Sequence, residues 1–215
     1  MTNFLEFSKN PKHLYQTEKW SNIIILQFLI LFIILGSPAS GLPYILSKLQ
    51  LIETKISHLT FQQKMIQGLL IAPVVEECIF RLILKEKKTY FLITAVICIT
   101  IIAVEIIIEN HISAVVFMFI LFIVAVISFF HVKRLINLYS QNNYKYLYWC
   151  TIILYGLLHG LNFRFTNHWH IILIPLLTMP QIILGSILSY IRVKYGIFYS
   201  IIFHFIVNTQ ILFTH

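Results

Sequence analysis

"PVVEECIFRLILKEKK" occupies residues 73–88, and it places three charged side chains inside an apolar run. These charges are Glu76, Glu77 and Arg81, and a cluster of three lysines ends the stretch. An Asp, Lys or Arg at the centre of a membrane-spanning helix costs about 2.5–3.5 kcal/mol on insertion scales, so each such residue is a functional candidate. The lysine cluster is typical of the cytoplasmic edge of a membrane span.

The composition of the chain predicts an integral membrane protein. Of its 215 residues, 59% are hydrophobic and 11% are charged, whereas soluble domains average about 25% charged residues. No Ser/Gly/Pro-rich linker divides the chain, so we expect one domain over residues 1–215. The net charge of +8 lies in short clusters between apolar runs. That distribution favours membrane loops over a nucleic-acid surface, and we expect no nucleic-acid partner.

The hydrophobic pattern predicts an all-α fold, a polytopic transmembrane helix bundle with seven spans. A span needs about 20 mostly apolar residues. The stretch 42–56 is apolar with interspersed charges, and it fits either an interfacial amphipathic helix or a short eighth span. The seven predicted spans cover residues 21–37, 62–84, 89–108, 112–132, 146–163, 169–191 and 196–213.

The lysines and arginines predict a cytoplasmic N-terminus. With seven spans and this orientation, eleven of them fall on the inner side and four on the outer side, which satisfies the positive-inside rule. Arg81 is counted on neither side because it lies within a span. The inner residues are Lys9, Lys12, Lys19, Lys85, Lys87, Lys88, Lys133, Arg134, Lys145, Arg192 and Lys194, and the outer ones are Lys48, Lys55, Lys64 and Arg164.

Three ionisable side chains share one predicted depth in the membrane. At a rise of 1.5 Å per residue, Glu76 and His204 each lie roughly 12 Å from the inner ends of their spans, and His159 lies roughly 14 Å from Cys150. Residues four apart also share a helix face. The chain has three such polar pairs, Glu77 with Arg81, Tyr155 with His159, and His204 with Asn208.

These residues resemble the three motifs of the CPBP family, the intramembrane endopeptidases that include CAAX prenyl proteases and bacteriocin-processing (Abi) proteins. The family patterns run E-E-x-x-x-R, F-x-x-x-H and H-x-x-x-N, and the likeness covers residues 64–213. Two departures matter. Tyr155 stands where the family has Phe, and two extra predicted spans separate the first motif from the second.

The resemblance implies a glutamate-type peptidase that acts on a peptide or protein substrate without a cofactor. Glu76 is the expected general base, since a desolvated carboxyl group can take a proton near neutral pH. His159 is expected to share the attacked water. His204 and Asn208 are expected to donate hydrogen bonds to the developing oxyanion, and Glu77 is expected to neutralise Arg81.

Several alternatives stay open at the sequence level. Glu76, His159 and His204 also form a plausible open zinc site. A non-catalytic bacteriocin-immunity or scaffold protein of the same fold would keep the polar cluster for helix packing. A small proton-coupled transporter is a further alternative, although the sequence shows no inverted repeat. The small isoleucine-rich chain suggests a bacterial host, and hence the plasma membrane.

Overall fold

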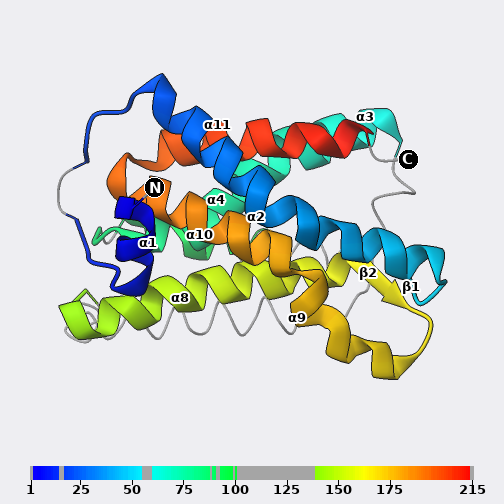
Figure 1. Ribbon diagram of the computed structural model, residues 1–215. Coiled ribbons are helices and arrows are strands. Elements are labelled where there is room, and N and C mark those ends of the chain that lie inside the picture. The colour runs from blue at the N-terminus through cyan, green and yellow to red at the C-terminus, as the bar shows by residue number, and fades with distance from the viewer. Residues whose placement is uncertain are drawn as a thin grey trace.

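The protein is a helical bundle in which long helices run back and forth between two ends (Figure 1). The computed structural model describes residues 2–14, 17–54, 60–87, 89–90, 93–98, 100 and 139–213, and most of these residues are helical. The predicted spans 89–108 and 112–132 lie outside the described residues, except for positions 89–90, 93–98 and 100, which are helical.

The N-terminal part forms a short helix and a long one. The short helix α1 (Thr2–Lys9) was not predicted, and its Phe4 packs edge-to-face against Phe28 and Tyr190. The long helix α2 (Asn22–Lys48) continues well past the predicted end at residue 37. The prediction of a separate helix or eighth span over 42–56 is therefore wrong. The helix ends where the backbone of Gln50 adopts a left-handed conformation with φ of 56°, a common way to end a helix.

The charged stretch belongs to a helical segment that changes its geometry along its length. It begins with α3 (Phe61–Gln63), in which Thr60 and Gln63 form a capping box, and continues as the π-helix η2 (Lys64–Ile71). It then becomes α4 (Ala72–Phe80) and, after Arg81, the 3-10 turn η3 (Leu82–Leu84). In the π-helical part the Ala72 N–H donates to the Gln67 carbonyl, five residues earlier. Proline has no N–H, so Pro73 cannot continue this ladder.

The next helix is α8 (Gln141–Leu158), which passes into the 3-10 turn η4 (His159–Asn162) and the strand β2 (Phe163–Phe165). Strand β2 pairs antiparallel with β1 (Ile52–Thr54), with Glu53 opposite Arg164. The all-α prediction is thus corrected by one small two-stranded sheet. Helix α8 also ends before the predicted boundary at residue 163, because the chain extends to pair with β1.

The last part of the chain forms the centre and one side of the bundle. It comprises η5 (His168–Leu173), α9 (Ile174–Leu177), α10 (Met179–Lys194), α11 (Ile197–Asn208) and η6 (Thr209–Phe213). Pro175 and Pro180 lie in the first turns of α9 and α10, where the missing N–H costs least. Helix α10 packs against α2, α8 and α11, so it is the central helix of the described bundle.

Of the three tyrosines at positions 144, 146 and 148 near the start of α8, two join separate parts of the chain. Tyr144 and Tyr148 are fully buried, and Tyr144 donates its hydroxyl hydrogen to the Leu84 carbonyl at 3.1 Å. Only Tyr146 of the three is largely exposed, at 74%. The start of α8 is thereby fixed beside the end of the segment that carries the glutamates.

Two helical segments of the described chain are long and apolar enough to cross a membrane. They are Asn22–Lys48 and Trp169–Lys194, and Ile197–Asn208 is a shorter apolar helix. At 1.5 Å per residue, the 27 residues of α2 extend about 40 Å, which exceeds the roughly 30 Å hydrocarbon core of a bilayer.

Candidate active site

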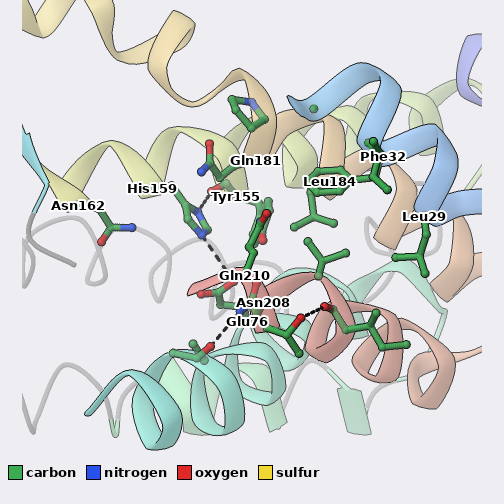
Figure 2. A pocket seen from close by; sticks show the side chains of 18 of the residues that line it. Leu29, Phe32, Glu76, Tyr155, His159, Asn162, Gln181, Leu184, Asn208 and Gln210 are labelled. Carbon is green, nitrogen blue, oxygen red and sulfur yellow. Dashed lines mark hydrogen bonds and ion pairs between the residues drawn. The ribbon is translucent and has the colours of Figure 1, made fainter. Parts of the chain in front are cut away.

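A cavity of about 530 Å³ lies between α2, the glutamate-bearing segment, α8, α10 and α11. One side of its wall is apolar and the other side is polar. Leu29, Phe32 and Ile33 of α2 make one side apolar. The other side carries Glu76 and His159, together with five carboxamide side chains that line the same space, Gln67, Asn162, Gln181, Asn208 and Gln210 (Figure 2).

Glu76 and two histidines converge at this wall. The Oε2 atom of Glu76 lies 3.8 Å from His159 Nε2 and 3.6 Å from His204 Nε2. Both separations exceed a hydrogen-bond length. The side chains of Glu76 and His159 are 23% and 21% exposed, whereas that of His204 is 1% exposed. Glu76 and His159 therefore face the cavity, and His204 lies behind them.

His159 lies at the point where α8 tightens into a 3-10 turn. Its Nδ1 lies 2.9 Å from the Tyr155 carbonyl oxygen. A carbonyl only accepts hydrogen bonds, so in the neutral ring the proton is on Nδ1 and the Nε2 lone pair points toward Glu76 (Figure 2). The backbone of α8 thus sets both the tautomer and the direction of this imidazole.

Glu77 lies one residue further along α4 and is fully buried. The predicted pair with Arg81 is present, with 3.6 Å between Glu77 Oε1 and Arg81 Nη1. The same oxygen lies 3.1 Å from His204 Nδ1, and Ser200 Oγ donates to the other oxygen at 2.5 Å. Glu77 therefore joins α4 to α11 as well as neutralising Arg81.

Tyr155 connects the arginine to the histidine. The guanidinium carbon of Arg81 lies 3.8 Å from the centroid of the Tyr155 ring, within the range of a cation–π contact. The Tyr155 hydroxyl lies 3.3 Å from His204 Nε2. Gly185 of α10 allows this packing, because a Cβ atom there would lie only 2.8 Å from Tyr155 Cδ1.

Asn208 lines the cavity, but its amide also has a partner in the backbone. Its Nδ2 donates to the Gly68 carbonyl at 3.0 Å. In the π-helical register that carbonyl would accept from residue 73, which is a proline without an N–H. One N–H of Asn208 therefore replaces the missing backbone donor, a role that the sequence analysis did not assign.

The polar members of this site that were missed in the sequence include Gln67, Asn162, Gln181, Ser200 and Gln210. Ser200 lies four residues before His204, so Ser200, His204 and Asn208 form one polar stripe along α11. That spacing was a usable signal. Gln181, which lines the cavity, carries no such signal because its position depends on how α10 docks.

The end of the bundle nearest the N-terminus is strongly basic. Lys85 is buried and donates to the Leu14 carbonyl, and Arg192 Nε donates to the Arg81 carbonyl at 3.1 Å. Burial, together with the charges of Arg192 and Lys87, lowers the pKa of Lys85 from 10.5 to about 8.

Comparisons of the chain with protein-family models, with curated proteins and with solved structures find no match. Within the described residues, no group of three or more His, Cys, Asp and Glu side chains has the arrangement of a metal site. Any functional assignment therefore depends on the geometry of the site and on the sequence motifs.

Proposed function

We propose that this protein is an intramembrane endopeptidase of the CPBP type, which hydrolyses a peptide bond in a peptide or protein substrate. The observation that carries the proposal is the approach of His159 and His204 to one oxygen of Glu76 at a cavity wall. A hydrolase that uses water as its nucleophile needs such a base beside a space that water and substrate can reach.

Glu76 is the proposed general base because it is the carboxylate without a fixed cation. The neighbouring Glu77 is held by Arg81, His204 and Ser200. A water beside Glu76 can donate one hydrogen bond to the carboxylate and another to His159 Nε2. Proton transfer from this water to Glu76 leaves a hydroxide to attack the scissile carbonyl. The proton now on Glu76 then passes to His159 Nε2, 3.8 Å from Glu76 Oε2, and from there to the leaving amine.

The exposed apolar surface of α2 supports the membrane setting of this proposal. Ile23, Leu26, Ile33 and Ile34 are each more than half exposed, and a run of exposed apolar side chains is stable only against lipid or a partner. We place the chain in a bacterial plasma membrane with seven spans and a cytoplasmic N-terminus.

The decisive experiment is a cleavage assay on purified protein in liposomes. The probe is a quenched fluorescent peptide that ends in a prenylated Cys-aliphatic-aliphatic-X sequence, and a second probe is an unprenylated peptide of the same sequence. We expect cleavage by the wild type and none by Glu76→Gln. Glu53→Gln, which removes an exposed carboxylate on β1, is the matched control and should retain full activity. Undiminished cleavage by Glu76→Gln would refute the assignment of the base.

In the zinc alternative the metal ligands are Glu76 Oε2, His159 Nε2 and His204 Nε2. The same cleavage assay tests it. Loss of cleavage in a strong chelator, restored by added zinc, would replace the metal-free mechanism by a zinc-dependent one. Unchanged cleavage in the chelator supports water activation by Glu76 alone.

A second candidate function is a non-catalytic scaffold or bacteriocin-immunity protein of the same fold. The burial of Glu77, Arg81, Ser200 and His204 favours it, since these four residues join α4 to α11 whether or not the cavity is catalytic. This candidate predicts that Glu76→Gln retains protection of the cell or binding of the partner. Under the peptidase proposal, that variant loses any function that depends on cleavage.

A further inference from the structure

His204 has three polar neighbours that compete for its two ring nitrogens. Nδ1 lies 3.1 Å from Glu77 Oε1. Nε2 lies 3.3 Å from the Tyr155 hydroxyl and 3.6 Å from Glu76 Oε2. Tyr155 is the position at which this chain departs from the family pattern, so its hydroxyl adds a partner that a phenylalanine lacks.

Glu77 determines which ring nitrogen of a neutral His204 carries the proton. Glu77 is buried, lies 3.6 Å from Arg81 and accepts a hydrogen bond from Ser200. Those neighbours favour the ionised carboxylate, which only accepts hydrogen bonds. The proton of a neutral His204 is therefore on Nδ1, and Nε2 carries the lone pair. In this tautomer His204 has no ring N–H left for the oxyanion contact that its sequence motif led us to expect.

Tyr155 determines which hydrogen bond the Nε2 lone pair of His204 accepts. The Tyr155 ring is held between the Arg81 guanidinium and Gly185 of α10, and the residue is 1% exposed. Its hydroxyl cannot turn away to water, and it lies nearer to Nε2 than Glu76 does. The Glu76 carboxylate is the other acceptor within reach of this hydroxyl, so the proposal requires that the hydroxyl donates to Nε2. Donation from this hydroxyl satisfies Nε2 in the neutral ring and opposes a proton on that atom.

We propose that the Tyr155 hydroxyl is a positioning group that holds His204 as the neutral Nδ1–H tautomer and so leaves His159 as the histidine that exchanges a proton with Glu76. The charged and titratable groups around His204 are Glu76, Glu77 and Arg81 on the α4 segment and Tyr155 and His159 on α8. With phenylalanine at position 155, Glu76 is the only remaining partner of Nε2 among them. The tautomer with its proton on Nε2, directed at Glu76, then competes with the Nδ1–H tautomer.

The first test reads the tautomer directly and needs no substrate. Protein labelled with ¹⁵N in its histidines is studied by NMR at pH 7, and the His204 signals are identified by their loss in His204→Gln. We expect the wild type to show one protonated nitrogen, Nδ1. Tyr155→Phe should show a population with a proton on Nε2. A matched control, Tyr148→Phe, removes a hydroxyl that donates to the Ser186 carbonyl at 3.1 Å, and it should leave the His204 signals unchanged.

Two outcomes overturn the proposal. One is a proton on Nε2 of His204 in the wild type, a result that stands even where Tyr155→Phe fails to fold. The other is an identical His204 spectrum in wild type and folded Tyr155→Phe.

The second test is kinetic and rests on the proposed peptidase function. Tyr155→Phe should lower kcat by about two- to tenfold, the effect of one ordinary hydrogen bond, with KM unchanged. Tyr148→Phe should change neither value. If the wild type cleaves the probe and Tyr155→Phe has the same kcat, the role proposed for Tyr155 is wrong and the peptidase function stands. If neither protein cleaves the probe but the NMR spectra show the expected tautomer, the peptidase function is wrong and the role of Tyr155 stands.

Discussion

Asn208 and Pro73 lie 135 positions apart in the sequence, but both affect the hydrogen bonding of one backbone carbonyl, that of Gly68. Pro73 leaves the Gly68 carbonyl without a main-chain donor, and Asn208 supplies its side-chain amide at 3.0 Å. A buried carbonyl without a partner costs about 1–3 kcal/mol. The third motif therefore stabilises the helix that carries Glu76, in addition to any role that it has toward substrate.

We predict that Asn208→Ala lowers the free energy of unfolding by about 1–3 kcal/mol because the Gly68 carbonyl loses its donor. The measurement is denaturation of the purified protein in mixed detergent. Pro73→Ala restores a backbone N–H, so in that background Asn208→Ala should cost less, with a coupling of about 0.5 kcal/mol or more. Additive effects of the two substitutions contradict the shared role.

Much of the candidate site was predictable at the residue scale because it follows from helical spacing. Glu77 with Arg81 and His204 with Asn208 are one turn apart, and the same rule includes Ser200. The bond from His204 to Glu77 was not predictable. Sequence spacing gives the face of a helix, but it does not tell which of two adjacent glutamates a distant imidazole reaches.

At the scale of elements, the approach of α8 to α10 decides the shape of the site. Gly156 of α8 and Gly185 of α10 lie where Cβ atoms would overlap Ile182 and Tyr155, respectively. Small residues let two helices come close. Because α8 and α10 lie close together, the Tyr155 ring packs against Arg81 and the Tyr155 hydroxyl points toward His204.

We predict that Gly185→Ala destabilises the protein by about 1–3 kcal/mol, as overpacking in a tight core does. It should also reduce cleavage if the proposed peptidase function holds, because Tyr155 must move. Gly41→Ala is the control, since a Cβ atom at Gly41 of α2 meets nothing within 4 Å. Thermal melting and the cleavage assay measure the two effects. Equal stability of the two variants contradicts the tight contact.

Apart from α1 (Thr2–Lys9), the existence of the long described helices was predictable from hydrophobic runs, but their ends and irregularities were not. Residues 42–48 continue α2, because the chain stays helical as far as the turn at Gln50. Strands β1 and β2 are three residues long and lie more than 100 residues apart in the sequence. No local sequence pattern therefore predicts that they pair. The π-helix before Pro73 likewise has a partner far away in the sequence, since Asn208 donates to its Gly68 carbonyl.

At the scale of the whole molecule, one end of the bundle carries an excess of positive charge. Lys85 is buried there beside Arg192, and Lys194 forms an ion pair with Glu18 at 3.2 Å. The β1–β2 sheet lies at the opposite end (Figure 1). If the bundle spans a membrane, the positive-inside rule predicts that the basic end faces the cytoplasm.

The lowered pKa of Lys85 predicts how stability changes with pH. Between pH of about 8 and 10.5, the unfolded chain keeps a proton on Lys85 that the folded chain has released. Stability contributed by this residue therefore rises with pH across that window. Melting temperatures measured from pH 7.5 to 10 should show a smaller rise in Lys85→Gln than in the wild type. Lys145→Gln removes an exposed charge and should keep the wild-type slope. An equal slope in all three proteins contradicts the prediction.

The charge polarity also predicts which end faces the cytoplasm. In a variant without Cys78, Cys98 and Cys150, a single cysteine is placed at the exposed Lys19 or at the exposed Arg164 on β2. A membrane-impermeant maleimide should label Arg164→Cys in right-side-out vesicles and Lys19→Cys only in inside-out vesicles. A permeant maleimide should label both in either preparation. Since α2 is long enough to separate the two ends by the thickness of a bilayer, labelling of both positions from the same side would contradict the membrane-spanning arrangement itself.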